Sequence, residues 1–194
     1  MGDYSNNELI MSILSNRRRA SAYLRAHFID KFEINMHRFG HSVGYWVGNA
    51  YAAGLLDDNE DENREAIIGN RRRILAKLNI TGIIACMPNP EMPYANDGIE
   101  YLVVPITDVD NDENRQILTS MMPQIIRFIG EHNTLIHCDF LGSSRSSTVA
   151  IAIEIAHGRD FGRTYMALQG VRPISNPKFG NWLELYEKTQ CRTC

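Results

Sequence analysis

The sequence has few cysteines, no long apolar run and no strong excess of charge of either sign. Its four cysteines in 194 residues are too few and too unevenly spaced for the disulfide framework of a secreted domain, which favours a reducing compartment. No stretch reaches the ~18 to 20 consecutive apolar residues that cross a bilayer, and no apolar region of signal-peptide type begins the chain. We therefore expect an intracellular, cytoplasmic protein without a membrane partner, with the nucleus as the alternative location.

The charge balance also argues against nucleic acid as a partner. The formal net charge is -3, so the chain as a whole lacks the basic surface that attracts phosphate backbones, although basic runs occur at 16–21 and 70–75. Cys191 and Cys194 form a C-x-x-C pair with no second pair of ligands nearby. The sequence therefore predicts neither a metal nor another cofactor.

Short apolar runs alternate with helical patterns over most of the chain, and 44% of the residues are hydrophobic, which is enough for a buried core. An aromatic and β-branched run at 39–54 predicts a first strand or hairpin. Further strands are expected at 80–87, 99–106 and 134–138, and helices at 71–79, 115–132, 146–158, 160–171 and 177–189. This alternation is typical of an α/β fold with a mostly parallel sheet and flanking helices.

Residues 5–31 carry apolar side chains at helical spacing and predict one or two helices ahead of the sheet. We expect an N-terminal helical extension over 1–35, one α/β domain over 36–190 and a tail over 191–194. The apolar stripe of the extension could mediate a homodimer or could pack on its own domain, and both interpretations stay open.

The stretch HCDFLGSSRSS, residues 137–147, joins an apolar strand to a helix through a Gly/Ser loop. In open α/β sheets ligands bind at the carboxyl ends of strands, where a helix N-terminus offers free N–H groups and a positive dipole end. Arg145 could add a bidentate grip on phosphate, and such surroundings favour the thiolate of Cys138. The alternative is that Cys138 is a buried strand-end thiol and that Ser143 or Ser144 merely caps the helix.

An acid for this chemistry could come from the loop after the preceding strand. Attack by a thiolate on a phosphoryl group needs an acid that protonates the leaving oxygen. Asp108, Asp110 and Asp112 are the candidates there, although acidic loop residues are often simply solvated.

Five segments in matching order resemble the dual-specificity branch of the protein tyrosine phosphatase superfamily, including its compact virus-encoded members. They are YWVGNAYAA (45–53), LNITGIIACM (78–87), YLVVPITD (101–108), HCDFLGSSRSS (137–147) and VRPISNPKF (171–179). The resemblance implies the cysteine phosphatase fold, a central, mostly parallel, mixed-edge sheet of about five strands flanked by helices. It also implies a hydrolase that removes phosphate from phosphotyrosine, phosphoserine and phosphothreonine in partner proteins through a phosphocysteine intermediate.

The same resemblance implies roles for individual residues. Cys138 would be the nucleophile, Arg145 the phosphate clamp, and Ser146 the hydroxyl that hydrogen-bonds the departing thiolate. Asp108 would be the general acid, with Asp110 as its competitor. The phosphate would be bound by the loop between nucleophile and helix, namely Asp139, Phe140, Leu141, Gly142, Ser143, Ser144 and Arg145. His137 would be structural, and Asn176 would brace this loop from outside.

The chain departs from the family pattern in one spacing. Six residues separate Cys138 from Arg145, whereas the family has five, and the match of GSSRSS assigns the surplus residue to 139–141. One residue adds up to ~3.3 to 3.8 Å of chain, and a misplacement of ~1 Å can cost ~100-fold in rate. If the loop bulges outward near Phe140, the chain is an active phosphatase, which is our prediction. If it widens instead, the chain is a pseudophosphatase that binds phosphoproteins.

Overall fold

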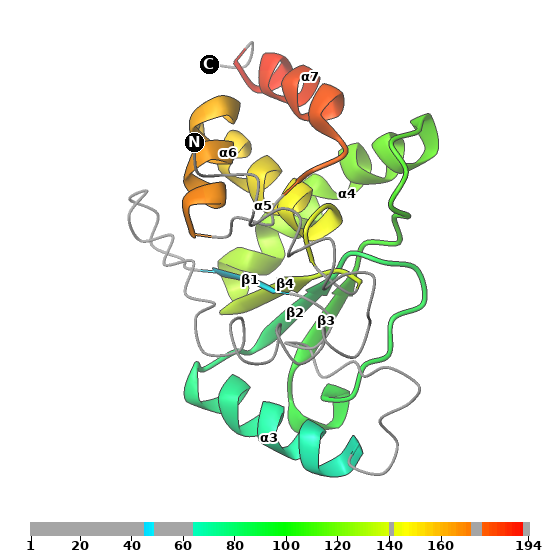
Figure 1. The fold of residues 1–194 in the computed structure, drawn as a ribbon, viewed down its shortest axis with the longest axis vertical. Coiled ribbons are helices and arrows are strands. Elements are labelled where there is room, and N and C mark those ends of the chain that lie inside the picture. Colours follow the sequence, from blue (N-terminus) through cyan, green and yellow to red (C-terminus); the bar gives the residue numbers. More distant parts are fainter. Residues whose placement is uncertain (1–44, 49–63, 140–141, 172–175, 192–194) are drawn as a thin grey trace, which may run out of the picture. The chain divides into compact units, whose positions relative to one another are not determined.

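The computed structural model describes residues 45–48, 64–139, 142–171 and 176–191. Four strands, β1 (Tyr45–Gly48), β2 (Gly82–Ala85), β3 (Glu100–Val103) and β4 (Thr134–His137), form one sheet in the order β1-β4-β2-β3 (Figure 1). Every pairing in it is parallel. The α/β class and the flanking helices are therefore confirmed.

The sheet differs in detail from the predicted one. Within the described ranges it has four strands in place of about five, and it shows no mixed edge. The strand predicted within 39–54 is present as β1, which pairs in parallel with β4, with Tyr45 opposite Thr134. The rest of 39–54 lies outside the described residues, so the hairpin alternative stays a prediction. A parallel neighbour this distant in sequence requires the intervening helices and strands as a crossover connection.

Helices cover both faces of the sheet, so the two central strands are buried throughout. The helix α3 (Arg64–Lys77) lies on one face, and α4 (Asp112–Glu131), α5 (Arg145–Ala156), α6 (Phe161–Val171) and α7 (Gly180–Gln190) lie on the other side (Figure 1). Successive side chains on a strand point to opposite faces. Ile83 accordingly joins the cluster under α3, and Ile84 joins the larger core under the other helices.

The helix α5 lies inside the core. Its residues from Arg145 to Ile155 are all buried, and those after the first turn are apolar except Glu154. It contacts α4, α6 and α7 as well as β1 and β4. This central helix fixes the position of the loop that precedes it, which is the loop after β4.

The helix α4 begins three residues earlier than the sequence pattern predicts. The carboxamide oxygen of Asn111 accepts a hydrogen bond from the Asn114 backbone N–H at 2.9 Å and caps the helix. Asp112 and Glu113 therefore lie in the first helical turn, where negative charge is favourable, and the prediction of a loop through 114 is wrong. Pro123 lies inside the helix and does not mark its first turn.

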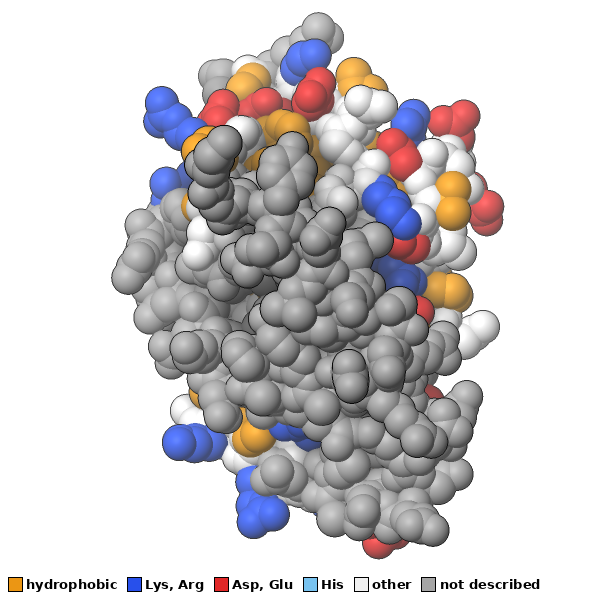
Figure 2. Space-filling model, in the orientation of Figure 1, with side chains coloured by type: hydrophobic (Ala, Val, Ile, Leu, Met, Phe, Trp, Pro, Cys, Tyr) orange, Lys and Arg blue, Asp and Glu red, His pale blue; other side chains and the backbone are white. Residues whose placement is uncertain are grey.

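The predicted extension 1–35, with its dimer role, and the end of the predicted tail lie outside the described residues. Among the helices of the described ranges, none is both long and apolar enough to span a membrane. On the described part of the face in Figure 2, acidic and basic side chains are interspersed.

Candidate active site

The candidate site lies at the carboxyl end of β4, where the chain passes into α5. Cys138 directly follows the strand and is 2% exposed. Its thiol donates to Ser146 Oγ at 3.4 Å, and the Ser146 hydroxyl donates to the Gly142 carbonyl at 2.8 Å. Cys138 and Ser146, which the sequence predicts to act together, therefore lie in contact.

The loop of residues 139–145, which the resemblance predicts to bind phosphate and which is here called the phosphate loop, is described except for Phe140 and Leu141. The Gly142 N–H donates to the Asp139 carbonyl at 2.8 Å, so the two residues that flank the undescribed pair lie close together. Gly142 has φ 58, a left-handed conformation that glycine adopts without strain. On either side of Phe140 and Leu141 the backbone is therefore held by a direct hydrogen bond.

Ser143 and Ser144 are held from outside the phosphate loop. The Ser143 carbonyl accepts the Asn176 backbone N–H at 2.7 Å, and Ser144 Oγ accepts the Lys178 N–H at 3.3 Å. Asn176 therefore contacts the loop, as predicted, but through its backbone. Ser144 is the N-cap residue of α5, yet its side chain makes no capping hydrogen bond, so the interpretation of this serine as a mere helix cap is not supported.

Arg145 lies at the start of α5 and is 8% exposed. Its Nη1 donates to the Ile106 carbonyl at 3.4 Å, and its Nη2 lies 3.7 Å from Asp139 Oδ2. Its Nε is buried and has no hydrogen-bond partner among the described residues. The guanidinium thus lies between Asp139 of the phosphate loop and Ile106 in the segment after β3. Its Nε–H is a donor that an oxyanion could accept.

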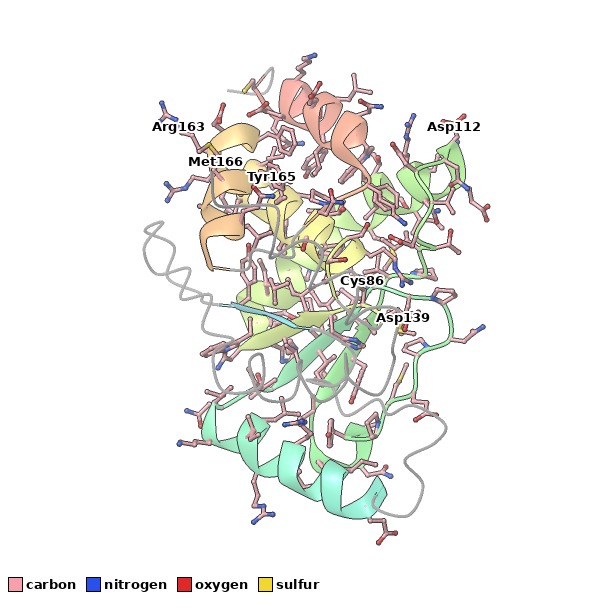
Figure 3. The ribbon with its side chains drawn as sticks, viewed as in Figure 1. Cys86, Asp112, Asp139, Arg163, Tyr165 and Met166 are labelled. Atoms are coloured by element: carbon pink, nitrogen blue, oxygen red, sulfur yellow. The ribbon has the colours of Figure 1, made fainter. Side chains whose placement is uncertain are left out.

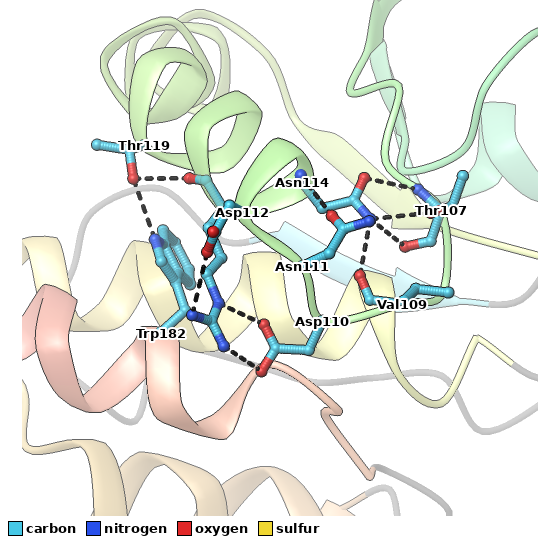
Figure 4. A network of polar contacts seen from close by, with 9 residues as sticks. Thr107, Val109, Asp110, Asn111, Asp112, Asn114, Thr119 and Trp182 are labelled. Carbon is cyan, nitrogen blue, oxygen red and sulfur yellow. Dashed lines mark hydrogen bonds and ion pairs between the residues drawn. The ribbon is translucent and has the colours of Figure 1, made fainter.

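The three predicted acids have different surroundings. Asp110 is held by Arg115 in a bidentate pair, with distances of 2.7 Å and 3.0 Å, and Asp112 is almost fully exposed on α4 (Figure 4). The Asp108 carboxylate instead contacts the ammonium group of Lys178. Lys178 also donates its backbone N–H to Ser144 Oγ, so Asp108 is the acid connected to the phosphate loop.

Asn114 is a residue that the sequence analysis missed. Its Nδ2 donates to Thr107 Oγ1 at 2.8 Å and to the Val109 carbonyl at 2.7 Å, and its Oδ1 accepts the Thr107 N–H at 3.1 Å (Figure 4). These bonds fix the backbone on both sides of Asp108. The sequence signal was slight, because Asn114 stands in a charged stretch that was interpreted as a solvated loop.

Cys86 was also missed, and it lies beside the candidate nucleophile. It follows β2, and its N–H donates to the His137 carbonyl at 2.8 Å on the neighbouring strand. Burial raises the pKa of the Cys86 thiol, and the nearby Cys138 raises that pKa further, while Arg145 opposes both effects. Figure 3 shows Cys86 and Asp139 at the same end of the sheet, a proximity that only the strand order reveals.

In the described part of the chain, no group of three His, Cys, Asp or Glu side chains could hold a metal ion. His137 is fully buried, and its Nδ1 lies 3.4 Å from the Cys138 carbonyl. Burial lowers the pKa of His137 to about 4, with Arg145 adding to the shift and the Cys138 carbonyl opposing it. The imidazole is therefore neutral at pH 7 and acts as a packed part of the strand end.

The lowered pKa of His137 predicts a specific acid sensitivity. Below pH ~6.5 the unfolded chain binds a proton at this histidine while the folded chain does not until about pH 4, so stability falls across this window. The shift corresponds to about 3 kcal/mol of unfolding free energy. We expect the unfolding free energy, measured by chemical denaturation, to decline less steeply between pH 6.5 and 4 in His137→Asn than in wild type. An equal decline in both proteins would refute the lowered pKa of His137.

No family model matches the chain. Mouse (Mus musculus) dual specificity phosphatase 28 is 28% identical over 156 residues, covering 74% of this chain and 80% of the relative. The crystal structure of a mouse dual specificity phosphatase complexed with zinc tungstate superposes with a TM-score of 0.62 at 24% identity, covering 77% of this chain and 86% of that one.

A third relative is the human tyrosine phosphatase-like serine/threonine/tyrosine-interacting protein, whose crystal structure gives a TM-score of 0.53 at 24% identity. It covers 63% of this chain and 85% of that one. The two solved structures have the same fold as this chain, and the alignment with the mouse sequence relative covers most of both chains. The chain is therefore similar, in sequence over most of its length and in fold, to the dual-specificity phosphatases of the protein tyrosine phosphatase superfamily.

Proposed function

We propose that this chain hydrolyses phosphate esters of proteins, with Cys138 as the nucleophile. The observation that carries the proposal is the chain of contacts from the Cys138 thiol to Ser146 Oγ and from there to the Gly142 carbonyl. Arg145 starts the helix next to this contact chain. In this proposal the nucleophile, the hydroxyl for its thiolate and the guanidinium for the phosphate are three buried side chains at the junction of β4 and α5.

In the proposed first step, the Cys138 thiolate attacks phosphorus, a P–S bond forms and the P–O bond to the leaving group breaks. Asp108 gives its proton to the leaving oxygen, while Arg145 and the loop N–H groups stabilise the equatorial oxygens. In the second step, water attacks the phosphocysteine, its proton passes to Asp108, and the P–S bond breaks. The Ser146 hydroxyl, which donates to the Gly142 carbonyl in the resting structure, then turns to donate its one proton to the departing thiolate and stabilises it.

We propose phosphotyrosine, phosphoserine and phosphothreonine in partner proteins as the substrates. The name of the mouse relative, dual specificity phosphatase, supports this range. The formal net charge of -3 does not favour the RNA 5'-triphosphatase activity that some members of the superfamily have.

The lengthened loop is compatible with this chemistry in our proposal. The hydrogen bond between the Gly142 N–H and the Asp139 carbonyl joins the two flanks of Phe140 and Leu141. Beside this longer loop Cys138 and Ser146 are in contact, and Arg145 contacts Ile106 and Asp139. We infer that the extra residue does not displace the reacting groups.

A second function, capture of phosphoproteins without turnover, has its own support. Asp139 Oδ2 lies 3.7 Å from Arg145 Nη2, so a carboxylate competes with the phosphate for the guanidinium. The human relative named as phosphatase-like and interacting with serine, threonine and tyrosine also fits a binding role. This function predicts oxyanion binding with no release of product.

The assignment of the acid can be tested with two isosteric variants. We expect Asp108→Asn to slow the hydrolysis of phenyl phosphate by ~100-fold or more, because a poor leaving group needs the proton. Asp110→Asn is the matched control, since Asp110 is already paired with Arg115, and it should stay within a few-fold of wild type. The measurement is kcat for aryl phosphates of increasing leaving-group pKa, and the reverse order of effects would transfer the role to Asp110.

A further inference from the structure

The segment 176–178, which leads into α7, is bonded to the phosphate loop. The Asn176 N–H donates to the Ser143 carbonyl at 2.7 Å, and the Lys178 N–H donates to Ser144 Oγ at 3.3 Å. Phe179, the next residue, is fully buried in the core. The backbone of Lys178 is therefore held between the phosphate loop on one side and the core on the other.

The side chain of Lys178 reaches the loop that carries the candidate acid. Its ammonium group contacts Asp108 Oδ2 and donates to the Asp108 carbonyl at 3.4 Å. The other carboxylate oxygen, Oδ1, is shielded from solvent and has no hydrogen-bond partner among the described residues. A shielded polar atom without a partner costs free energy, and a catalytic role is one explanation for its retention.

We propose that Lys178 is a positioning residue for Asp108, holding Oδ2 so that Oδ1 faces the substrate and carries the transferred proton. The inference rests on the proposed hydrolase function. Asn114 and Lys178 hold different parts of the acid. Asn114 fixes the backbone at Thr107 and Val109, and Lys178 holds the carboxylate of Asp108 between them.

The ion pair contributes little to stability. Lys178 and Asp108 side chains are 56% and 39% exposed, and ion pairs in such surroundings are weakened by water and salt. Removing the ammonium should therefore leave the fold intact and should release only the side chain of Asp108. This makes Lys178 a suitable site for substitution.

The experiment compares wild type with Lys178→Met, Lys178→Arg and, as the matched control, Lys77→Met on the exposed side of α3. Phenyl phosphate serves as the substrate with a poor leaving group and 6,8-difluoro-4-methylumbelliferyl phosphate as the substrate with a good one. We expect Lys178→Met to lose ~10-fold in kcat on phenyl phosphate but less than ~2-fold on the second ester, because a misplaced acid affects only the poor leaving group. Lys178→Arg should recover most of the loss, and Lys77→Met should match wild type.

Equal losses on both esters, or no loss on either, would overturn the inference while leaving the hydrolase function in place. If wild type hydrolyses neither ester, the proposed function fails, and crystal structures then test the positioning by themselves. The inference predicts that the Asp108 carboxylate turns away from its wild-type position in Lys178→Met. An unchanged carboxylate in that structure would overturn it whether or not the chain turns over.

Discussion

Replacing Cys138 with Ser is expected to reduce the hydrolysis of an aryl phosphate by about 1000-fold or more. A serine hydroxyl is a weak nucleophile unless a base removes its proton. His137 cannot be that base, because its buried Nδ1 faces the Cys138 carbonyl and its Nε2 has no hydrogen-bond partner among the described residues. The measurement is kcat with 6,8-difluoro-4-methylumbelliferyl phosphate at pH 6 to 7.

The matched control for this variant is Cys191→Ser, which replaces the exposed cysteine after α7. Cys191→Ser should keep the wild-type kcat. A loss of kcat in Cys138→Ser alone would then show that the reaction depends on the thiol of Cys138. The Cys138→Ser variant should also still bind vanadate, because Arg145 and the loop N–H groups remain in place. Turnover that persists in Cys138→Ser would remove Cys138 from the reaction.

The second large effect is expected from Arg145→Lys. The guanidinium lies between the Ile106 carbonyl and Asp139, and its planar fork suits two oxygens of a phosphate at once. A lysine offers a point charge without that geometry, so we expect kcat/KM to fall by ~100- to 1000-fold. Inhibition by vanadate should weaken in parallel, since the same group would hold the inhibitor.

Arg163→Lys is the control for this substitution, since Arg163 is exposed on α6, away from the phosphate loop (Figure 3). The control should keep both the rate and the affinity for vanadate. A near wild-type Arg145→Lys enzyme would mean that the backbone N–H groups alone bind the phosphate, and the clamp assignment would then be wrong.

The sequence was sufficient to predict the elements that carry the candidate site. The apolar run at 134–138 ends at Cys138, and the buried helix after Arg145 has the predicted start within one residue. Both predictions rest on local patterns, namely a short apolar run and a Gly/Ser stretch before a helix. The contact between Cys138 and Ser146 follows from these two elements being consecutive.

Contacts between distant segments could not be predicted in the same way. Cys86 lies beside Cys138 because β2 neighbours β4, and Lys178 reaches Asp108 across 70 positions in sequence. The start of α4 was missed because Asn111 caps the helix from within a charged stretch that also suits a loop. These relationships depend on strand order and tertiary packing, which periodicity does not encode.

The most direct test of the account is the turnover of wild type beside a variant that lacks Phe140, which restores the usual five-residue spacing. The account predicts that wild type hydrolyses 6,8-difluoro-4-methylumbelliferyl phosphate, because Cys138 and Ser146 lie in contact beside Arg145 at the start of α5 despite the longer loop. Deleting Phe140 should then bring no large gain. An inactive wild type that gains turnover on deletion would contradict the account and would identify a pseudophosphatase disabled by one residue.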